Sequence, residues 1–190
     1  MPTATTTTVN PPFNLLQWID ENKEHLRPPV SNKQFFNEAQ DVIVFVSGGP
    51  NTRNDYHVNA TEELFYQIQG DICVGIRDAD GSHPRDVIIR QGEMFLLPRH
   101  LPHQPRRPAN TVGLIIEFPR GQADDALHWY CPNCDALVHA AKWKLTRIDK
   151  DLAVIMEEFW EGPVERRTCK KCDTVIQRAT AIDPIPSADT

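Results

Sequence analysis

The sequence predicts a mainly β protein, a sandwich or barrel, followed by a small C-terminal metal-binding appendage. Three observations lead to this prediction. The chain has 190 residues, 40% of them hydrophobic, which is enough for one substantial core. Short β-rich runs separated by Gly, Pro, Asn and Asp fill the stretch from about residue 40 to 118. Two C-x-x-C pairs follow in the last third of the chain.

The first predicted element is one amphipathic helix. Asn14 is a suitable N-cap with Gln17 three residues later, apolar residues then follow a helical period, and Pro28-Pro29 ends the helix. A second helix is expected at residues 152–160, between the two cysteine pairs. Six short strands are expected between the helices, at residues 42–46, 64–68, 72–76, 87–89, 94–97 and 112–116.

The chain is expected to divide into four parts. Residues 1–12 are rich in Thr and Pro and are predicted to form a disordered tail. Residues 13–125 hold the first helix and the β-rich region, which we expect to form one domain. Residues 126–180 hold both cysteine pairs and the second helix, and residues 181–190 are expected to be a flexible tail.

Composition narrows the classes of function. The net charge is -6 and the isoelectric point is about 5.6, which argues against a general nucleic-acid binder, because such proteins carry a basic face. The sequence shows no membrane segment and no signal-peptide pattern. We therefore expect a cytoplasmic protein without nucleic-acid or membrane partners. The composition does not exclude a small-molecule ligand. Such a ligand could be anionic, because a local arginine cluster can bind an anion whatever the total charge.

Four cysteines form the strongest local signal. Cys131 and Cys134 make one C-x-x-C pair and Cys169 and Cys172 the other, and four thiolates can form a tetrahedral cage for a soft metal. In a reducing cytoplasm such pairs are more often metal ligands than disulfides, which are the alternative. Cys73 lies apart in an alternating strand, where we expect a small buried hydrophobic residue.

A second set of candidate metal ligands lies inside the β-rich region, and its nitrogen and oxygen atoms are chemically harder ligands than the cysteine sulfurs. His57 and Glu63 stand before and at the start of one predicted strand, and His103 follows a turn marked by Gly92 and Pro98. Two imidazoles and one carboxylate on neighbouring strands can occupy one face of an octahedral ion and leave three positions free. Such a site suits Fe(II) that binds both an organic substrate and dioxygen. Taken alone, His57 and Glu63 are better explained as solvent-facing loop residues.

Residues 49–70 and 92–103 resemble the two motifs of the cupin superfamily. Asp55 replaces the usual first histidine, the carboxylate comes late, and His100 stands where glycine is common. The implied fold is a double-stranded β-helix, or jelly-roll, barrel. Residues 13–125 would then be the cupin catalytic domain.

Six short segments narrow this resemblance. Together they resemble the 3-hydroxyanthranilate 3,4-dioxygenase family over about residues 13–172, in the short single-cupin form of bacteria and fungi that carries a rubredoxin-like four-cysteine site. The segments are GGPN at 48–51, RNDYH at 53–57, EELFYQ at 62–67, FLLP at 95–98, HQPRRP at 103–108 and WYC at 129–131.

The resemblance implies roles for the residues that bind metal and substrate. His57, Glu63 and His103 match the ligands of a catalytic Fe(II), with His100 as the weaker rival of His103. Glu63 is also expected to touch the substrate. Arg53 and Arg107 match the pair that binds the substrate carboxylate, for which a planar guanidinium is suited because it donates two parallel hydrogen bonds.

Two further carboxylates are expected to take part. Glu117 matches a residue that contacts the ring substituents of the substrate and moves a proton. Asp55 is not assumed to bind metal although it occupies a cupin ligand position. We expect it to orient a ligand or an arginine.

The implied activity is extradiol cleavage of 3-hydroxyanthranilate with O2 to 2-amino-3-carboxymuconate semialdehyde. That product closes spontaneously to quinolinate, a precursor of NAD in the kynurenine pathway. Both oxygen atoms enter the product, so no external reductant is needed. The four cysteines are therefore expected to hold Fe or Zn in a structural or storage site, with His128 and His139 outside it. The resemblance also implies a homodimer.

Two alternatives stay open at this point. The first is another cupin metalloenzyme, a different dioxygenase or an isomerase, which would share the metal ligands but not need Arg53 together with Arg107. The second is a non-catalytic metal-binding sensor or interaction module, in which the four cysteines would be the functional centre.

Overall fold

Two antiparallel β-sheets form the body of the chain in this computed structural model, which describes residues 9, 11–27, 31–180 and 185. The predicted tails, 1–12 and 181–190, lie almost entirely outside the described residues. One sheet has the strand order β1 (Asn32–Phe35), β2 (Ile43–Gly48), β9 (Val112–Glu117), β4 (Glu63–Gln69), β7 (Met94–Leu97). The other has the order β11 (Leu137–Trp143), β10 (Asp125–Tyr130), β3 (Asp55–Val58), β8 (His103–Arg106), β5 (Ile72–Ile76), β6 (Arg85–Ile89).

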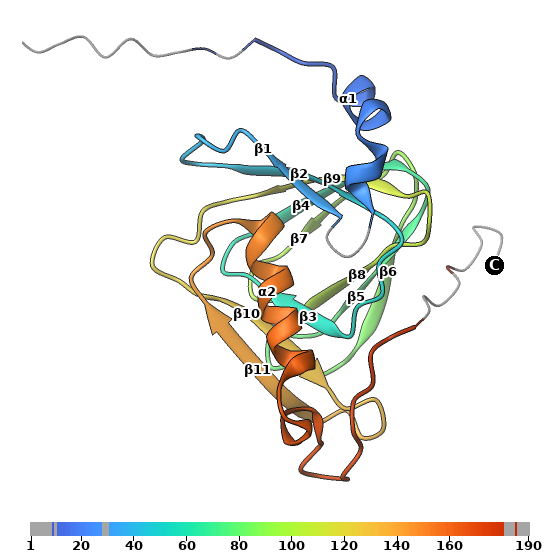
Figure 1. Cartoon of the computed structure of the whole chain (residues 1–190), viewed down its shortest axis with the longest axis vertical. Coiled ribbons are helices and arrows are strands. Elements are labelled where there is room, and N and C mark those ends of the chain that lie inside the picture. Colours follow the sequence, from blue (N-terminus) through green and yellow to red (C-terminus); the bar gives the residue numbers. More distant parts are fainter. Residues whose placement is uncertain (1–8, 10, 28–30, 181–184, 186–190) are drawn as a thin grey trace, which may run out of the picture.

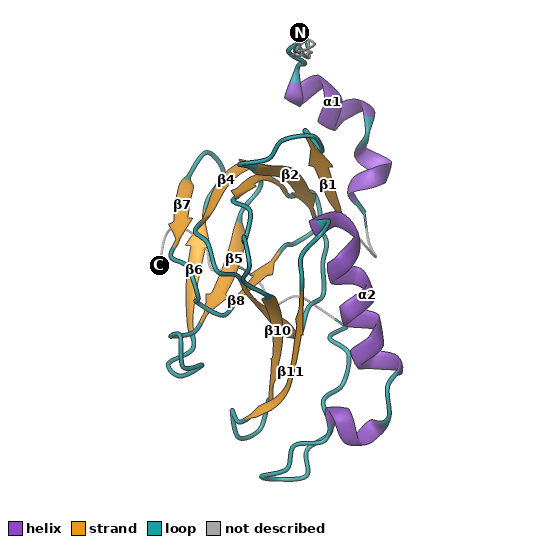
Figure 2. Cartoon of the chain, turned by 90° about the vertical axis from the view of Figure 1, so that its left-hand side faces the viewer, coloured by secondary structure: helices purple, strands orange, loops and turns teal. Residues whose placement is uncertain are grey.

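The two sheets face each other as a barrel, and the predicted fold class, a mainly β cupin barrel with a C-terminal cysteine region, is confirmed (Figures 1 and 2). The six predicted strands are present. Strands β1, β3, β8, β10 and β11 were not predicted. Two of these, with the sequences DYHV and HQPR, are short and polar. His57, His103 and Pro105 of these strands line a cavity, so the apolar alternation that identifies a strand is missing.

The N-terminal helix is shorter than predicted. Helix α1 (Leu15–Glu21) begins as expected, because the Asn14 side chain accepts a hydrogen bond of 3.0 Å from the Gln17 amide. It ends at Asn22, and the chain tightens into a 3₁₀ turn, η1 (Lys23–Leu26), well before Pro28. Pro28 and Pro29 lie outside the described residues. The helix and turn cover the outer face of the five-stranded sheet through a cluster of Ile19, Leu26, Val46 and Val112.

The second helix is longer than predicted. Helix α2 (Ile148–Glu161) begins four residues before the expected start, because the Asp151 carboxylate accepts hydrogen bonds from the Thr146 and Arg147 amides, at 2.6 and 2.9 Å. A short 3₁₀ turn, η2 (Val164–Arg167), follows it. Among the described residues no helix is both long and apolar enough to span a membrane.

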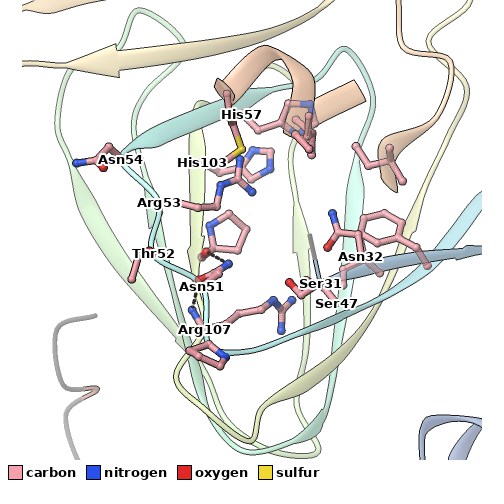
Figure 3. A pocket seen from close by; sticks show the side chains of 18 of the residues that line it. Ser31, Asn32, Ser47, Asn51, Thr52, Arg53, Asn54, His57, His103 and Arg107 are labelled. Atoms are coloured by element: carbon pink, nitrogen blue, oxygen red, sulfur yellow. Dashed lines mark hydrogen bonds between the residues drawn. The ribbon is translucent and has the colours of Figure 1, made fainter. Parts of the chain in front are cut away.

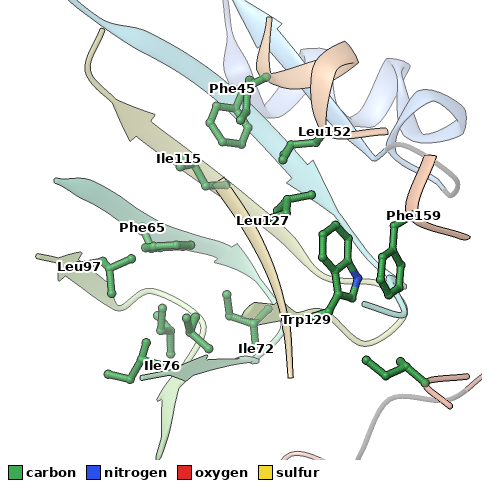
Figure 4. Packing of buried hydrophobic residues seen from close by; sticks show 14 residues of the cluster. Phe45, Phe65, Ile72, Ile76, Leu97, Ile115, Leu127, Trp129, Leu152 and Phe159 are labelled. Carbon is green, nitrogen blue, oxygen red and sulfur yellow. The ribbon is translucent and has the colours of Figure 1, made fainter. Parts of the chain in front are cut away.

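The main core fills the space between the sheets and continues under α2. Phe45, Phe65 and Ile115 from the barrel belong to the same buried cluster as residues of α2 (Figure 4). Phe159 of α2 stacks on Trp129 of β10 with ring centroids 4.1 Å apart. The proposed boundary between residues 125 and 126 falls at the start of β10, which pairs with both β3 and β11. Whether the two parts fold separately stays a prediction.

Candidate active site

Three strands bring His57, Glu63 and His103 together. His57 lies on β3 directly opposite His103 on β8, and Glu63 begins β4 in the other sheet. All three are buried, and their ligand atoms lie within 4.8 Å of one another. His103 Nε2 is 3.0 Å from Glu63 Oε2, while its Nδ1 lies 3.1 Å from the Leu101 carbonyl. Nδ1 therefore donates to that carbonyl. Burial lowers the pKa of His103, but Glu63 more than offsets this and raises it, so in the metal-free chain Nε2 also carries a hydrogen and donates it to Glu63.

The charges of this cluster suit a divalent cation. Burial lowers the pKa of His57, so its ring is neutral. Burial also opposes ionisation of Glu63, but His103 and His57 together hold the pKa of this carboxyl below its ordinary value. A buried, ionised carboxylate needs a positive charge beside it, which the proton on His103 supplies in the metal-free chain and a bound cation could supply in its place. The donor set therefore fits a bound metal of intermediate hardness such as Fe(II).

A cavity of about 310 Å³ lies next to the cluster and is lined by all three residues. Arg53, Arg107 and Glu117 also line it. In Figure 3, Arg107 lies across the cavity from His57 and His103. Helix α2 closes one side with apolar side chains, namely Ile148, Leu152, Met156 and Trp160.

Arg107 is a buried cation on the cavity wall. Asn51 fixes its backbone, accepting from the Arg107 amide at 2.8 Å, and Arg107 Nη1 donates to Gln67 Oε1 at 3.2 Å. Glycine at 113 makes room for the guanidinium, since a Cβ there would lie 2.8 Å from Nη1. Burial and the nearby Arg53 lower the pKa of Arg107 to about 10. No carboxylate in the described part of the chain pairs with it, so the site favours an anionic ligand.

Arg53 is held differently, by a carboxylate. Its Nε lies 3.3 and 3.1 Å from the two oxygens of Asp55, and its Nη2 donates to the same group. Gln104 also donates to the Arg53 carbonyl at 2.7 Å. Asp55 thus lies against an arginine and outside the metal cluster. Its predicted orienting role stays a prediction that these contacts support.

Glu117 ends β9, where its Cα is paired with that of Glu63 on β4. Burial, and then repulsion from Glu63, raise the pKa of Glu117 to about 8. Near neutral pH, with no cation present, this carboxyl therefore keeps its proton. A group whose proton affinity lies near neutrality can accept or return a proton during a reaction.

Two polar residues behind the cavity were missed by the sequence reasoning. Asp125 Oδ2 lies 2.7 Å from His57 Nε2, and Arg120 binds both Asp125 and Glu117. Burial raises the pKa of Asp125, but His57 and Arg120 more than offset this and hold it below its ordinary value. The i, i+3 spacing of Glu117 and Arg120 is the only local signal, and it is a common one.

The four cysteines form a second cluster, at the far end of β10. Three pairs of sulfur atoms lie 3.4 to 3.5 Å apart, and none forms a disulfide. These separations exceed the length of an S–S bond and fit four sulfurs around one tetrahedral ion. Asp135 and Asp173 follow the two pairs with φ angles of 61° and 58°, a conformation that favours glycine but that Asp tolerates.

The rival residues lie outside both clusters. His100 is exposed at a turn with φ of 65°, His128 lies beside Tyr130, and His139 packs against Trp129. Cys73 is buried as expected, and its sulfur also accepts a hydrogen bond of 3.0 Å from Arg106.

Comparison with known proteins identifies the family of the chain. The family described as 3-hydroxyanthranilic acid dioxygenase matches residues 7–160. Among curated relatives, a 3-hydroxyanthranilate 3,4-dioxygenase from Jannaschia sp. is 47% identical over 165 residues, covering 86% of this chain and 89% of the relative. A 3-hydroxyanthranilate 3,4-dioxygenase from Neurospora crassa is 44% identical over 162 residues, which cover 85% of this chain and 87% of the relative.

The solved structures are more distant. The alignment with a cupin-2 domain protein from Shewanella frigidimarina covers 56% of this chain and 93% of the Shewanella chain, with 19% identity and a TM-score of 0.42. At that distance the assignment rests on the sequence matches, which cover most of the chain and include every residue of the buried cluster and cavity wall named above. The chain therefore belongs to the 3-hydroxyanthranilic acid dioxygenase family.

Proposed function

We propose that this chain opens the ring of 3-hydroxyanthranilate with O2 to give 2-amino-3-carboxymuconate semialdehyde, which closes to quinolinate. The observation that carries the proposal is the pairing of two features on one cavity. A buried N, N, O cluster can bind a metal, and a buried arginine without an acidic partner in the described chain faces the same space. The substrate has a matching carboxylate, and its neighbouring amine and hydroxyl groups can chelate a metal.

We assign the metal at His57, Glu63 and His103 as Fe(II). Bound there, Fe(II) would leave positions for the substrate and O2 and would supply the one-electron chemistry that activates O2. Both oxygen atoms enter the product and the bond between ring carbons 3 and 4 breaks, so no reductant is required.

The residues of the chain bind and orient the substrate. Arg107 and Arg53 would bind its carboxylate, and Asp55 would keep the Arg53 guanidinium aimed at it. Burial and the charge of Glu63 raise the pKa of Glu117 to about 8 in the metal-free chain, and a metal bound at Glu63 would offset that charge. Glu117 could then ionise, accept the proton of the ring hydroxyl and return it later. The apolar side chains of α2 would exclude water from the side of the cavity that they line.

We propose a structural or storage role for the metal of the cysteine cluster, either Fe or Zn. Its four sulfurs do not line the cavity that holds the histidines and Glu63. The proposed reaction also needs no electron from outside. The free thiols fit a reducing compartment such as the cytoplasm. Trapping of reduced thiols in intact cells would test that location.

We propose a homodimer formed through the outer face of the five-stranded sheet. Outward-facing side chains of β4 and β7 make an apolar patch, in which Tyr66 pairs with Met94 and Leu64 with Leu96. Met94 is 63% exposed and Leu96 52% exposed. Such a patch on a sheet edge is a candidate interface. Met94→Lys combined with Leu96→Lys should convert a dimer into a monomer in sedimentation experiments. An unchanged mass would show that this surface is not the dimer interface.

One experiment tests the activity directly. The purified full chain is loaded anaerobically with Fe(II), 3-hydroxyanthranilate is added, and air is then admitted. Oxygen uptake and quinolinate formation should rise together with one O2 consumed per ring opened. A fully metallated chain that takes up no oxygen would overturn the proposal.

A further inference from the structure

A continuous chain of buried polar side chains connects the candidate metal cluster with Glu117. It runs from His57 through Asp125 and Arg120 to Glu117. Asp125 is fully buried, and the Arg120 side chain is only 3% exposed. The proposed reaction assigns no part to either of these two residues.

Every nitrogen of the Arg120 guanidinium has a partner. Nε donates to Asp125 Oδ1 at 2.7 Å, and Nη2 donates to Asp125 Oδ2 at 3.1 Å and also to Glu117. Nη1 donates to the Phe118 carbonyl at 2.6 Å and to Thr61 at 3.3 Å. A planar guanidinium bound on all sides has one allowed orientation, so its two carboxylate partners are held at a fixed separation.

Arg120 lies between the two sheets, so its hydrogen bonds fix residues of one sheet relative to residues of the other. Glu117 is the last residue of β9 in one sheet, and Asp125 is the first residue of β10 in the other. Arg120 lies on the connection between them. It therefore joins the two sheets at the place where strands of both sheets supply the residues of the metal cluster.

Asp125 transmits this constraint to His57. Its Oδ2 lies 2.7 Å from His57 Nε2, and in the described part of the chain no hydrogen bond joins Asp125 to His103 or Glu63. A carboxylate that binds one nitrogen of an imidazole sets the rotation of the ring and the position of its hydrogen. The same arginine thus restrains a candidate metal ligand and the candidate proton acceptor.

We propose that Arg120 is a positioning residue for this reaction, acting on Glu117 directly and on His57 through Asp125. The inference rests on the proposed function. It predicts that losing Arg120 slows the chemical step and leaves substrate binding nearly intact, since Arg53 and Arg107 make no contact with it. A residue that only tied the two sheets together would affect stability alone.

The test variants are Arg120→Met, Arg120→Lys and Asp125→Asn. The control is Arg90→Met, which removes an ion pair with Asp71 (N–O distance 2.8 Å) whose residues do not line the cavity. Arg120→Met should lower kcat by about 10- to 100-fold and change KM by less than about threefold, at unchanged iron content. Arg120→Lys should recover part of kcat, because an ammonium can still bind one carboxylate. Arg90→Met should leave kcat unchanged.

A spectroscopic readout separates positioning from stability. Nitric oxide added anaerobically to the Fe(II)-loaded chain gives an electron paramagnetic resonance signal that reports the symmetry around the metal. Arg120→Met and Asp125→Asn should shift this signal, and Arg90→Met should not. Lower melting temperatures in the Arg120 variants with unchanged kcat, KM and spectrum would overturn the proposal.

Two outcomes need separate treatment. If Arg120→Met does not fold, Arg120→Lys and Asp125→Asn carry the test, and wild-type kinetics and spectra in both would overturn the inference. If the wild-type chain opens no ring, the proposed function fails. A shifted nitric oxide spectrum in the variants would still support the positioning role.

Discussion

The two candidate metal clusters of this chain are built in opposite ways. His57, Glu63 and His103 come from three strands of two sheets, are all buried and line a cavity. The four cysteines come from two tight turns, and Cys134 and Cys172 are partly exposed. The first cluster offers nitrogen and oxygen atoms and the second offers only sulfur, so they select different metals. The difference supports the proposal that the first cluster serves the reaction and the second serves stability or storage.

The largest effect is expected from the barrel cluster. His103→Ala should remove iron from that site and lower kcat/KM by about 1000-fold or more, equivalent to about 4 kcal/mol. The metal of the cysteine cluster should stay, and elemental analysis per chain together with oxygen uptake would measure both. Loss of metal from both sites would show that the clusters are not independent.

The reverse pattern is expected for the cysteine cluster. Cys169→Ser should release its metal and lower the free energy of unfolding by about 3 kcal/mol, because Cys169 is a buried ligand. The folded fraction should keep its ring-opening rate per barrel iron. Chemical denaturation and single-turnover kinetics measure the two quantities. Complete loss of turnover in folded, iron-loaded protein would give the cysteines a catalytic role.

Replacing Arg107 should weaken substrate binding and stabilise the folded chain. Arg107→Met removes the group proposed to bind the substrate carboxylate, so KM should rise by about 100-fold, or about 2.7 kcal/mol. The substrate-free variant should melt at a higher temperature than the wild type, because a buried cation without a carboxylate partner in the described chain is replaced by an apolar side chain of similar length. Arg99→Met, at an exposed turn position, is the matched control and should change neither value.

The smallest effect concerns pH. The folded pKa of Glu117 is raised from 4.5 to about 8, so the folded metal-free chain binds a proton here that the unfolded chain releases. This contribution to stability is fully present below pH 4.5 and is lost as the pH rises through 8. Denaturation of metal-free wild type and Glu117→Gln across this range should show a steeper decline for the wild type. Parallel curves would contradict the raised pKa.

The pH experiment also bears on the comparison of the two clusters. In the Cys169→Ser background, Glu117→Gln should change the pH dependence of stability by the same amount as in the wild type, since Glu117 binds Arg120 and is paired with Glu63 but bonds with none of the cysteines. A different effect of Glu117→Gln in the two backgrounds would mean that the cysteine cluster alters the barrel site.

Local patterns in the sequence were sufficient for part of this description. The two C-x-x-C pairs predicted the cysteine cluster, because each pair closes within one turn and needs little from the rest of the fold. Asn14 predicted the start of α1, and alternating apolar residues predicted six strands. The candidate iron ligands were first suggested by their residue types and spacing, but a histidine and a glutamate near a loop carry little signal alone, so the resemblance to a family was needed to prefer them.

Only the tertiary structure decided which side chains share the cavity and how they are charged. Strand pairing brings Glu63 next to Glu117 and His57 next to His103, although these partners are tens of residues apart. Burial then raises the pKa of Glu117 and leaves Arg107 without an acidic partner in the described chain, and Arg120 and Asp125 become visible as a link between two sheets. The sequence by itself determined the two α-helices, six of the strands, the ligand types and the family. Their charge states and mutual positions depend on desolvation and long-range packing, which no local pattern records.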